Sequence, residues 1–240
     1  MFNIMKDLPK SLWIVIIAHG VTDLSAGALL VALPFLKAKF GLTYAEVSAI
    51  ALIQNLTSSV SQPLFGYFSD KKPRPWLMPA GCLISGISMV ASLGASHYYW
   101  TLVFTAITGL GMAAFHPEAA KTANRLSGRA KGKGVSLFSV GGNAGFAAGS
   151  LLLAALVYGG ADNRMFFYIL PYILLGGPLI NMTRNLPNPE MKQAGSVKSL
   201  KAAFNWPLLS LLGMVLSRST VASGISTFVP LYYVSYLHGS

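Results

Sequence analysis

Two side chains near the start of the chain could exchange protons inside an apolar segment. His19 and Asp23 are four residues apart, which places them on one face of a helix. Asp23 lies about 18 Å along a helix that starts at Ser11, given a rise of 1.5 Å per residue. An apolar environment favours the protonated form of a carboxyl group, and a neighbouring imidazole can share the proton. We interpret the two residues as a proton-titrating pair, and a structural hydrogen bond to a neighbouring helix is the alternative.

A second group of ionisable residues lies in the run Met112–Lys121. Glu118 and Lys121 are three residues apart on one helical face, where they could form an ion pair near the cytoplasmic end of the helix. The alternative is a functional group that includes His116, since Pro117 is expected to kink the helix beside it and to open it toward a cavity. Both interpretations of Glu118 stay open at the level of the sequence.

Arg218 is the one charged residue of the last apolar segment. A guanidinium group near the middle of a bilayer needs an acid, a cage of carbonyl groups or an anionic ligand. Asp23 is one candidate partner, and a phosphonate or a similar small anion is another. We expect Arg218 and His116 to recognise a small anionic substrate.

The elements that position these residues are long and apolar. Hydrophobic residues make up 53% of the chain and charged residues 10%, against about 25% charged residues in soluble domains, and the mean hydropathy is +0.56. This composition excludes a water-soluble globular protein. A membrane span needs about 20 apolar residues, and seven segments satisfy this: residues 11–36, 43–69, 76–96, 98–126, 134–159, 165–182 and 206–237.

The positions of the basic residues predict the orientation of these spans. With the N-terminus in the cytoplasm, thirteen basic residues lie on the cytoplasmic side and three, Lys37, Lys39 and Arg164, lie outside. The net charge of +11 therefore reflects membrane topology, and we expect no nucleic-acid partner. Within the membrane, charged residues recur on the first, fourth and seventh spans, as three-helix repeats around a cavity would require.

Polar residues of the second and fifth spans add to the expected pathway. Asn55 and Asn143 are the candidates there, and both lie within otherwise apolar segments. Glu46 is interpreted differently, because Thr43 and Glu46 form a capping-box pattern at the start of the second span.

Two motifs resemble those of the major facilitator superfamily. The run from Gly66 to Arg74 resembles the superfamily's loop motif between its second and third helices. The resemblance implies that Gly66, Asp70, Lys71 and Arg74 brace helix ends during conformational change. Glycines at four-residue spacing in the fifth span resemble its antiporter motif, although such spacing also serves close helix packing; these are Gly141, Gly145 and Gly149.

The run Met112–Lys121, together with His19 and Asp23, resembles the fosmidomycin-resistance branch of that superfamily. Thr105 stands where drug–proton antiporters of the superfamily commonly have an arginine. The resemblance implies an all-α membrane protein, with the N-terminal six-helix half of 3+3 inverted repeats over residues 1–182. A cytoplasmic linker over residues 183–205 and a seventh helix over residues 206–240 would follow. On this basis the chain stops before the other helices of the C-terminal half, which full function would need.

The resemblance also implies a function. We expect a proton-coupled exporter of a small drug or metabolite such as fosmidomycin, conferring antibiotic resistance, in a bacterial inner membrane. The alternatives are a truncated fragment that does not transport and an importer of a small anionic metabolite. No hydrolase or nucleotide-binding motif appears, so we expect no enzymatic activity, no cofactor and no bound metal.

Overall fold

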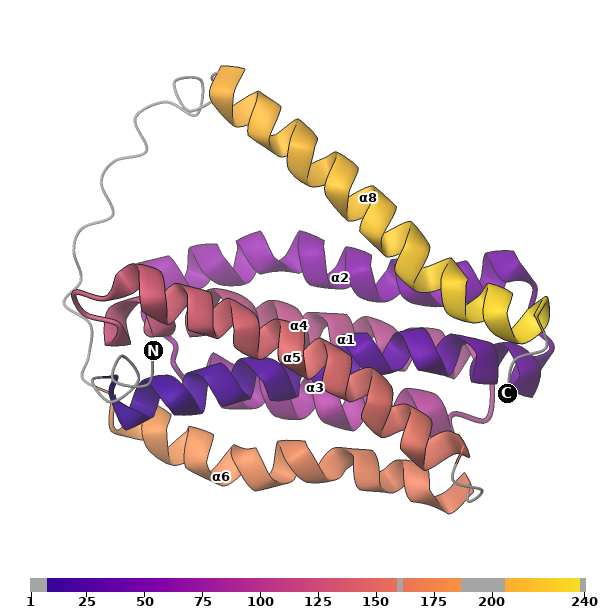
Figure 1. The fold of residues 1–240 in the computed structure, drawn as a ribbon. Helices are drawn as coiled ribbons and strands as arrows, with labels where there is room; N and C mark the ends of the chain where they lie inside the picture. The colour runs from indigo at the N-terminus through magenta and orange to yellow at the C-terminus, as the bar shows by residue number, and fades with distance from the viewer. Residues whose placement is uncertain (1–7, 159–161, 187–205, 238–240) are drawn as a thin grey trace. The chain divides into compact units, whose positions relative to one another are not determined.

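The computed structural model describes residues 8–158, 162–186 and 206–237, and all regular structure in these residues is helical (Figure 1). The chain divides into two compact units, Met1–Pro187 and Asn188–Ser240. The second unit contains helix α8 (Trp206–Ser235). The first unit contains α1 (Lys10–Phe40), α2 (Tyr44–Lys71), α3 (Leu77–Gly94), α4 (Tyr98–Leu126), α5 (Lys131–Tyr158), the 3₁₀ helix η2 (Asp162–Ile169) and α6 (Leu170–Arg184).

The seven α-helices of the described residues confirm the all-helical architecture expected from the sequence, with ends that differ by a few residues. The sixth expected span starts as η2 and continues as α6 through Arg184, whereas most of the expected linker lies outside the described residues. Five helical segments of the described chain are long and apolar enough to cross a membrane, namely α1, α3, α4, α5 and the segment Met165–Arg184. Helix α2 has the length but is less apolar, because it carries Gln54, Asn55 and Gln62 among several serines.

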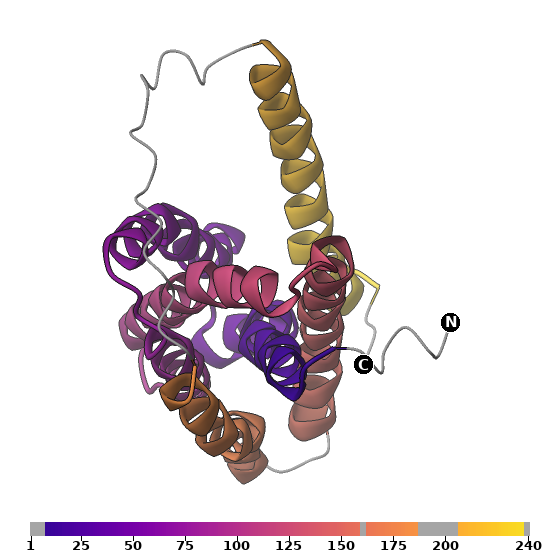
Figure 2. The ribbon, with the colours of Figure 1, turned by 90° about the vertical axis from the view of Figure 1, so that its left-hand side faces the viewer.

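Helix α1 is the centre of the first unit. It contacts α2, α3, α4, α5 and α6, and the view in Figure 2 shows the other helices around it. Buried residues occur on all sides of α1, as expected for a helix surrounded by protein. A polar side chain on α1 therefore meets its partners inside the bundle.

Glycines bring α1 and α5 into backbone contact. A Cβ atom at Gly145 would overlap the backbone of Gly20, and one at Gly149 would overlap the backbone of Leu24. A Cβ atom at Gly141 would lie 2.6 Å from the carbonyl oxygen of Ile16. The four-residue spacing of these glycines thus builds one continuous surface against α1, as small residues do between membrane helices.

Two tyrosines hold η2 and α6 against α1. The hydroxyl of Tyr168 donates a hydrogen bond of 2.7 Å to the carbonyl of Leu24, and the hydroxyl of Tyr172 lies 2.6 Å from that of Ser25. Both rings are fully buried. Because a buried hydroxyl needs a partner, these contacts fix the sixth span on α1.

The turn between α1 and α2 follows the capping pattern expected from the sequence. Gly41 ends α1 in the left-handed conformation, at φ 64°, and its N–H bonds to the carbonyl of Lys37. Thr43 and Glu46 form the reciprocal capping box, in which the Glu46 carboxylate accepts from the Thr43 backbone N–H at 2.8 Å. The capping interpretation of Glu46 is confirmed.

The glycine contact between α1 and α5 predicts a difference between two similar substitutions. Gly145→Ala should lower the stability of the fold by about 1–3 kcal/mol, because the added methyl group forces two backbones apart. Gly177→Ala on α6 is the matched control, since a Cβ atom there meets open space. Thermal unfolding of both variants in the same detergent measures the effect, and equal unfolding temperatures would contradict the packing role of Gly145.

Candidate functional site

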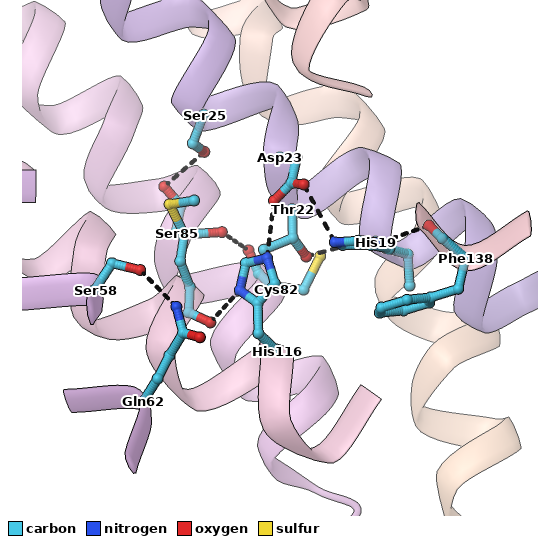
Figure 3. A network of polar contacts seen from close by, with 12 residues as sticks. His19, Thr22, Asp23, Ser25, Ser58, Gln62, Cys82, Ser85, His116 and Phe138 are labelled. Atoms are coloured by element: carbon cyan, nitrogen blue, oxygen red, sulfur yellow. Dashed lines mark hydrogen bonds and ion pairs between the residues drawn. The ribbon is translucent and has the colours of Figure 1, made fainter. Parts of the chain in front are cut away.

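The centre of the candidate site is Asp23, with one histidine on each of its carboxylate oxygens (Figure 3). His19, one turn earlier on α1, places its Nε2 atom 3.2 Å from Oδ2 of Asp23. His116 of α4 places its Nε2 atom 3.1 Å from Oδ1. All three side chains are largely buried, with exposures of 11% for His19, 17% for Asp23 and 21% for His116. We call these three residues the His–Asp–His cluster.

Backbone carbonyl groups orient both imidazole rings. Nδ1 of His19 lies 2.7 Å from the carbonyl oxygen of Phe138 on α5, and Nδ1 of His116 lies 2.7 Å from that of Met112. Because a carbonyl oxygen only accepts, Nδ1 of each ring carries a hydrogen and donates it. The Nε2 atoms of both rings are thereby directed at Asp23.

Helix α5 supplies the remaining wall of the cluster. The ring of Phe138 stacks on that of His19 with centroids 3.9 Å apart and planes 13° apart. A Cβ atom at Gly142 would overlap His19 and lie 2.7 Å from Oδ2 of Asp23, so only glycine leaves room for the cluster. Neither residue was expected from the sequence. The available signal was the pair Gly141–Gly142, because two adjacent glycines leave room for neighbours on two sides of the helix.

A cavity of about 540 Å³ adjoins the cluster. His19 and His116 form part of its wall, so the cluster borders a space that a small molecule or an ion can enter. The other lining residues combine polar groups with apolar ones; they are Ser59, Gln62, Pro63, Pro117, Ala120 and Phe138. The structure thus supports the expectation that His116 borders a cavity, and it adds His19 to the same wall.

Several expected pathway residues lie elsewhere. Asn55 on α2 and Asn143 on α5 are exposed, and neither lines this cavity. The buried amide of α2 is that of Gln54, whose Nε2 atom lies 3.5 Å from the sulfur of Met112 and whose Oε1 atom has no hydrogen-bond partner within the described residues. The sequence could not separate Gln54 from Asn55, because adjacent helical positions are about 100° apart and only tertiary packing decides which one is buried.

The ion pair between Glu118 and Lys121, one of the two alternatives that the sequence left open, does not form. Lys121 instead extends to the end of α2, where its Nζ atom lies 2.6 Å from Oδ1 of Asp70 and 3.3 Å from the carbonyl oxygen of Gly66. Glu118 is buried and accepts a hydrogen bond from the hydroxyl of Ser69. Contacts between helices replace the contact along one helix, because α2 and α4 pack closely here.

The other residues of the loop motif contact aromatic rings. The Nζ atom of Lys71 lies 4.4 Å from the ring centroid of Tyr67, and the guanidinium carbon of Arg74 lies 5.7 Å from that of Phe68. Gly66, Asp70 and Lys71 belong to the last turns of α2, and Arg74 follows its end. Arg218 lies on α8 of the second unit, where it is exposed.

Comparison with known proteins shows which family and which proteins this chain is similar to. The profile of the Major Facilitator Superfamily matches residues 15–240. The fosmidomycin resistance protein of Escherichia coli (strain K12) is 34% identical over 160 residues, which are 66% of this chain and 39% of that protein. The uncharacterized MFS-type transporter YfnC of Bacillus subtilis (strain 168) is 33% identical over 141 residues, 59% of this chain and 34% of that protein. The matches thus span less than half the length of these curated relatives.

Proposed function

This chain belongs to the Major Facilitator Superfamily, whose members are membrane transporters rather than enzymes, and we propose that it serves proton-coupled export of a small drug or metabolite. Its similarity to a fosmidomycin resistance protein supports fosmidomycin or a related small anion as the substrate, and hence a role in antibiotic resistance. The lipid bilayer and a small-molecule substrate are the partners that a transporter of this family requires.

The observation that carries the proton-coupling proposal is the His–Asp–His cluster. Both Nδ1 atoms donate to backbone carbonyl groups, so each contact between an Nε2 atom and Asp23 needs its own hydrogen. The cluster accordingly holds two protons when both contacts are hydrogen bonds. A carboxylate within the membrane is costly when unpaired, and release of these protons would therefore be coupled to a rearrangement of α1 against α4.

Other groups near Asp23 come from α3 and α6. Cys82 of α3 lies beside Thr22 (Figure 3), and the hydroxyl of Tyr172 on α6 contacts Ser25, two residues after Asp23 on α1. Cysteine and tyrosine side chains are ordinarily uncharged at neutral pH. The two histidines are therefore the ionisable side chains that contact Asp23 within the described residues.

Two further contacts support roles in conformational change. The glycines Gly141, Gly145 and Gly149 give α5 a smooth surface on which α1 can shift without interlocking side chains. The ion pair of Lys121 with Asp70 is partly exposed, at 39% and 62%, and such pairs stabilise by only about 0–1 kcal/mol. This pair is thus weak enough to open and close as α2 and α4 move, and Gly66, Lys71 and Arg74 would move with it.

The distribution of basic residues supports a cytoplasmic N-terminus in a bacterial inner membrane. In this orientation the loop between α4 and α5 lies inside, and the loop between α3 and α4 lies outside. A reporter active only in the cytoplasm should be active when fused after Gly128 and inactive when fused after Ser96. The opposite pattern would overturn the orientation.

Substitution of Asp23 tests proton coupling directly. Asp23→Asn keeps the shape of the side chain but removes its ability to bind a proton, so proton-driven export should fall to the level of vesicles without the protein. The measurement is substrate uptake into inverted vesicles with an imposed pH gradient. A metal chelator is present throughout. The protein is expressed from its own gene. His97→Gln is the control, since it removes an exposed histidine outside the cluster. Normal export by a well-expressed Asp23→Asn protein would contradict the proposal.

Substitution of Arg218 tests whether the substrate is an anion. Helix α8 contains no acidic residue, so we propose that Arg218 recognises a negatively charged group of the substrate. Arg218→Gln should then abolish resistance to phosphonate drugs in a sensitive host while protein abundance and resistance to neutral drugs are kept. Low abundance of Arg218→Gln, restored when Asp23 is also made neutral, would instead assign Arg218 to charge pairing with Asp23.

A further inference from the structure

We propose that His19, Asp23 and His116 form a binding site for one divalent transition-metal ion of the Zn²⁺ class. From the sequence we expected no bound metal; His116 is distant in the chain from His19 and Asp23, and only the packing of α4 on α1 brings it beside them. Their ligand atoms all lie within 4.8 Å of one another. The inference goes beyond proton-coupled transport and rests on the geometry of the donor atoms.

The orientation of the rings prepares two nitrogen ligands. Because Nδ1 of each histidine donates to a carbonyl group at 2.7 Å, the neutral ring presents a lone pair at Nε2. Metal-bound histidines typically donate their other ring nitrogen to a carbonyl or carboxylate group in this way, which fixes the tautomer and the ring orientation. Phe138 and Met112 supply these carbonyl groups, so the outer hydrogen bonds of a metal site are in place.

The histidine Nε2 atoms and the carboxylate oxygens of Asp23 face one another, and this arrangement requires positive charge between them. With neutral rings, two lone pairs face the two carboxylate oxygens of Asp23 at 3.2 and 3.1 Å. Two protons can occupy these contacts, as proposed above for proton coupling, and one divalent cation supplies the same charge. A divalent ion and the carboxylate together leave a net charge of about +1, which equals that of the doubly protonated cluster.

The distances suit a small transition-metal ion. Ligands at 2.0–2.1 Å in a tetrahedral arrangement lie about 3.3 Å apart, which is close to the two nitrogen–oxygen distances of the cluster. Two imidazoles and one carboxylate form a donor set that favours Zn²⁺ and its neighbours over Mg²⁺ or Ca²⁺, which prefer oxygen ligands. The three ligand atoms lie within 4.8 Å of one another, so the side chains must move closer together to reach the spacing of a tetrahedral site.

The site also offers an entry path and a free coordination position. His19 and His116 line the cavity of about 540 Å³, through which a hydrated ion can reach the cluster. Three protein ligands leave one tetrahedral position for water or for an anionic group. Gly142 keeps the space beside His19 and Asp23 clear of a side chain.

Calorimetric titration of the purified protein with Zn²⁺ in detergent tests this site. We expect one equivalent to bind, Mg²⁺ to give no signal, and His116→Gln or Asp23→Asn to weaken the affinity by more than the 10–100-fold that loss of an outer-shell partner typically causes. His97→Gln, which removes an exposed histidine, should bind like the unmodified protein. Unchanged affinity in folded His116→Gln and Asp23→Asn proteins would overturn the proposal, as would an equal loss in His97→Gln.

A spectroscopic measurement decides the question even if the variants do not fold. Co²⁺ bound to the unmodified protein by two nitrogens and one carboxylate in a four-coordinate site should give intense visible absorption that one equivalent of Zn²⁺ removes. Weak absorption typical of six-coordinate Co²⁺ would overturn the proposal. Because the export assay contains a chelator, failure of metal binding leaves proton-coupled transport standing, and failure of coupling leaves the metal site standing.

Discussion

Asp23 imposes the constraint on which the rest of the first unit depends. A carboxylate in the interior of an apolar bundle is stable only when hydrogen bonds and nearby positive charge replace water. Here each of its oxygens faces an imidazole nitrogen, and each imidazole is held by a backbone carbonyl group. Three helices, α1, α4 and α5, must therefore keep their relative positions for one side chain to be accommodated.

The close approach of α1 and α5 follows from that requirement. His19 can donate to the carbonyl of Phe138 only if the two backbones nearly touch, and Gly20 and Gly145 permit this. Gly142 then leaves the volume that the imidazole and the carboxylate occupy. The same glycines that resemble an antiporter motif thus have a direct physical role, because a smooth contact between backbones permits both close packing and movement.

Polar contacts at the end of α2 differ from the cluster in their exposure. Lys121 and Asp70 are partly exposed, so water screens their attraction and the pair can break at little cost. Glu118, three residues before Lys121, is buried and bonded to Ser69. Helix α4 therefore makes one buried and one partly exposed polar contact with the end of α2 within a single turn.

The amino-acid sequence by itself determined the helical architecture, most helix ends and the Thr43–Glu46 cap, because these depend on hydrophobic length and on hydrogen bonds between residues close in the chain. It also identified His19, Asp23 and His116 as polar residues within apolar segments, where each of them needs a polar partner. Only the tertiary structure decided which groups contact these three side chains. The approach of α4 to Asp23, the choice of Gln54 over Asn55 for burial, and the pairing of Lys121 with Asp70 all depend on how one helix is rotated against another. That rotation is set by the packing of whole surfaces, which no local spacing specifies.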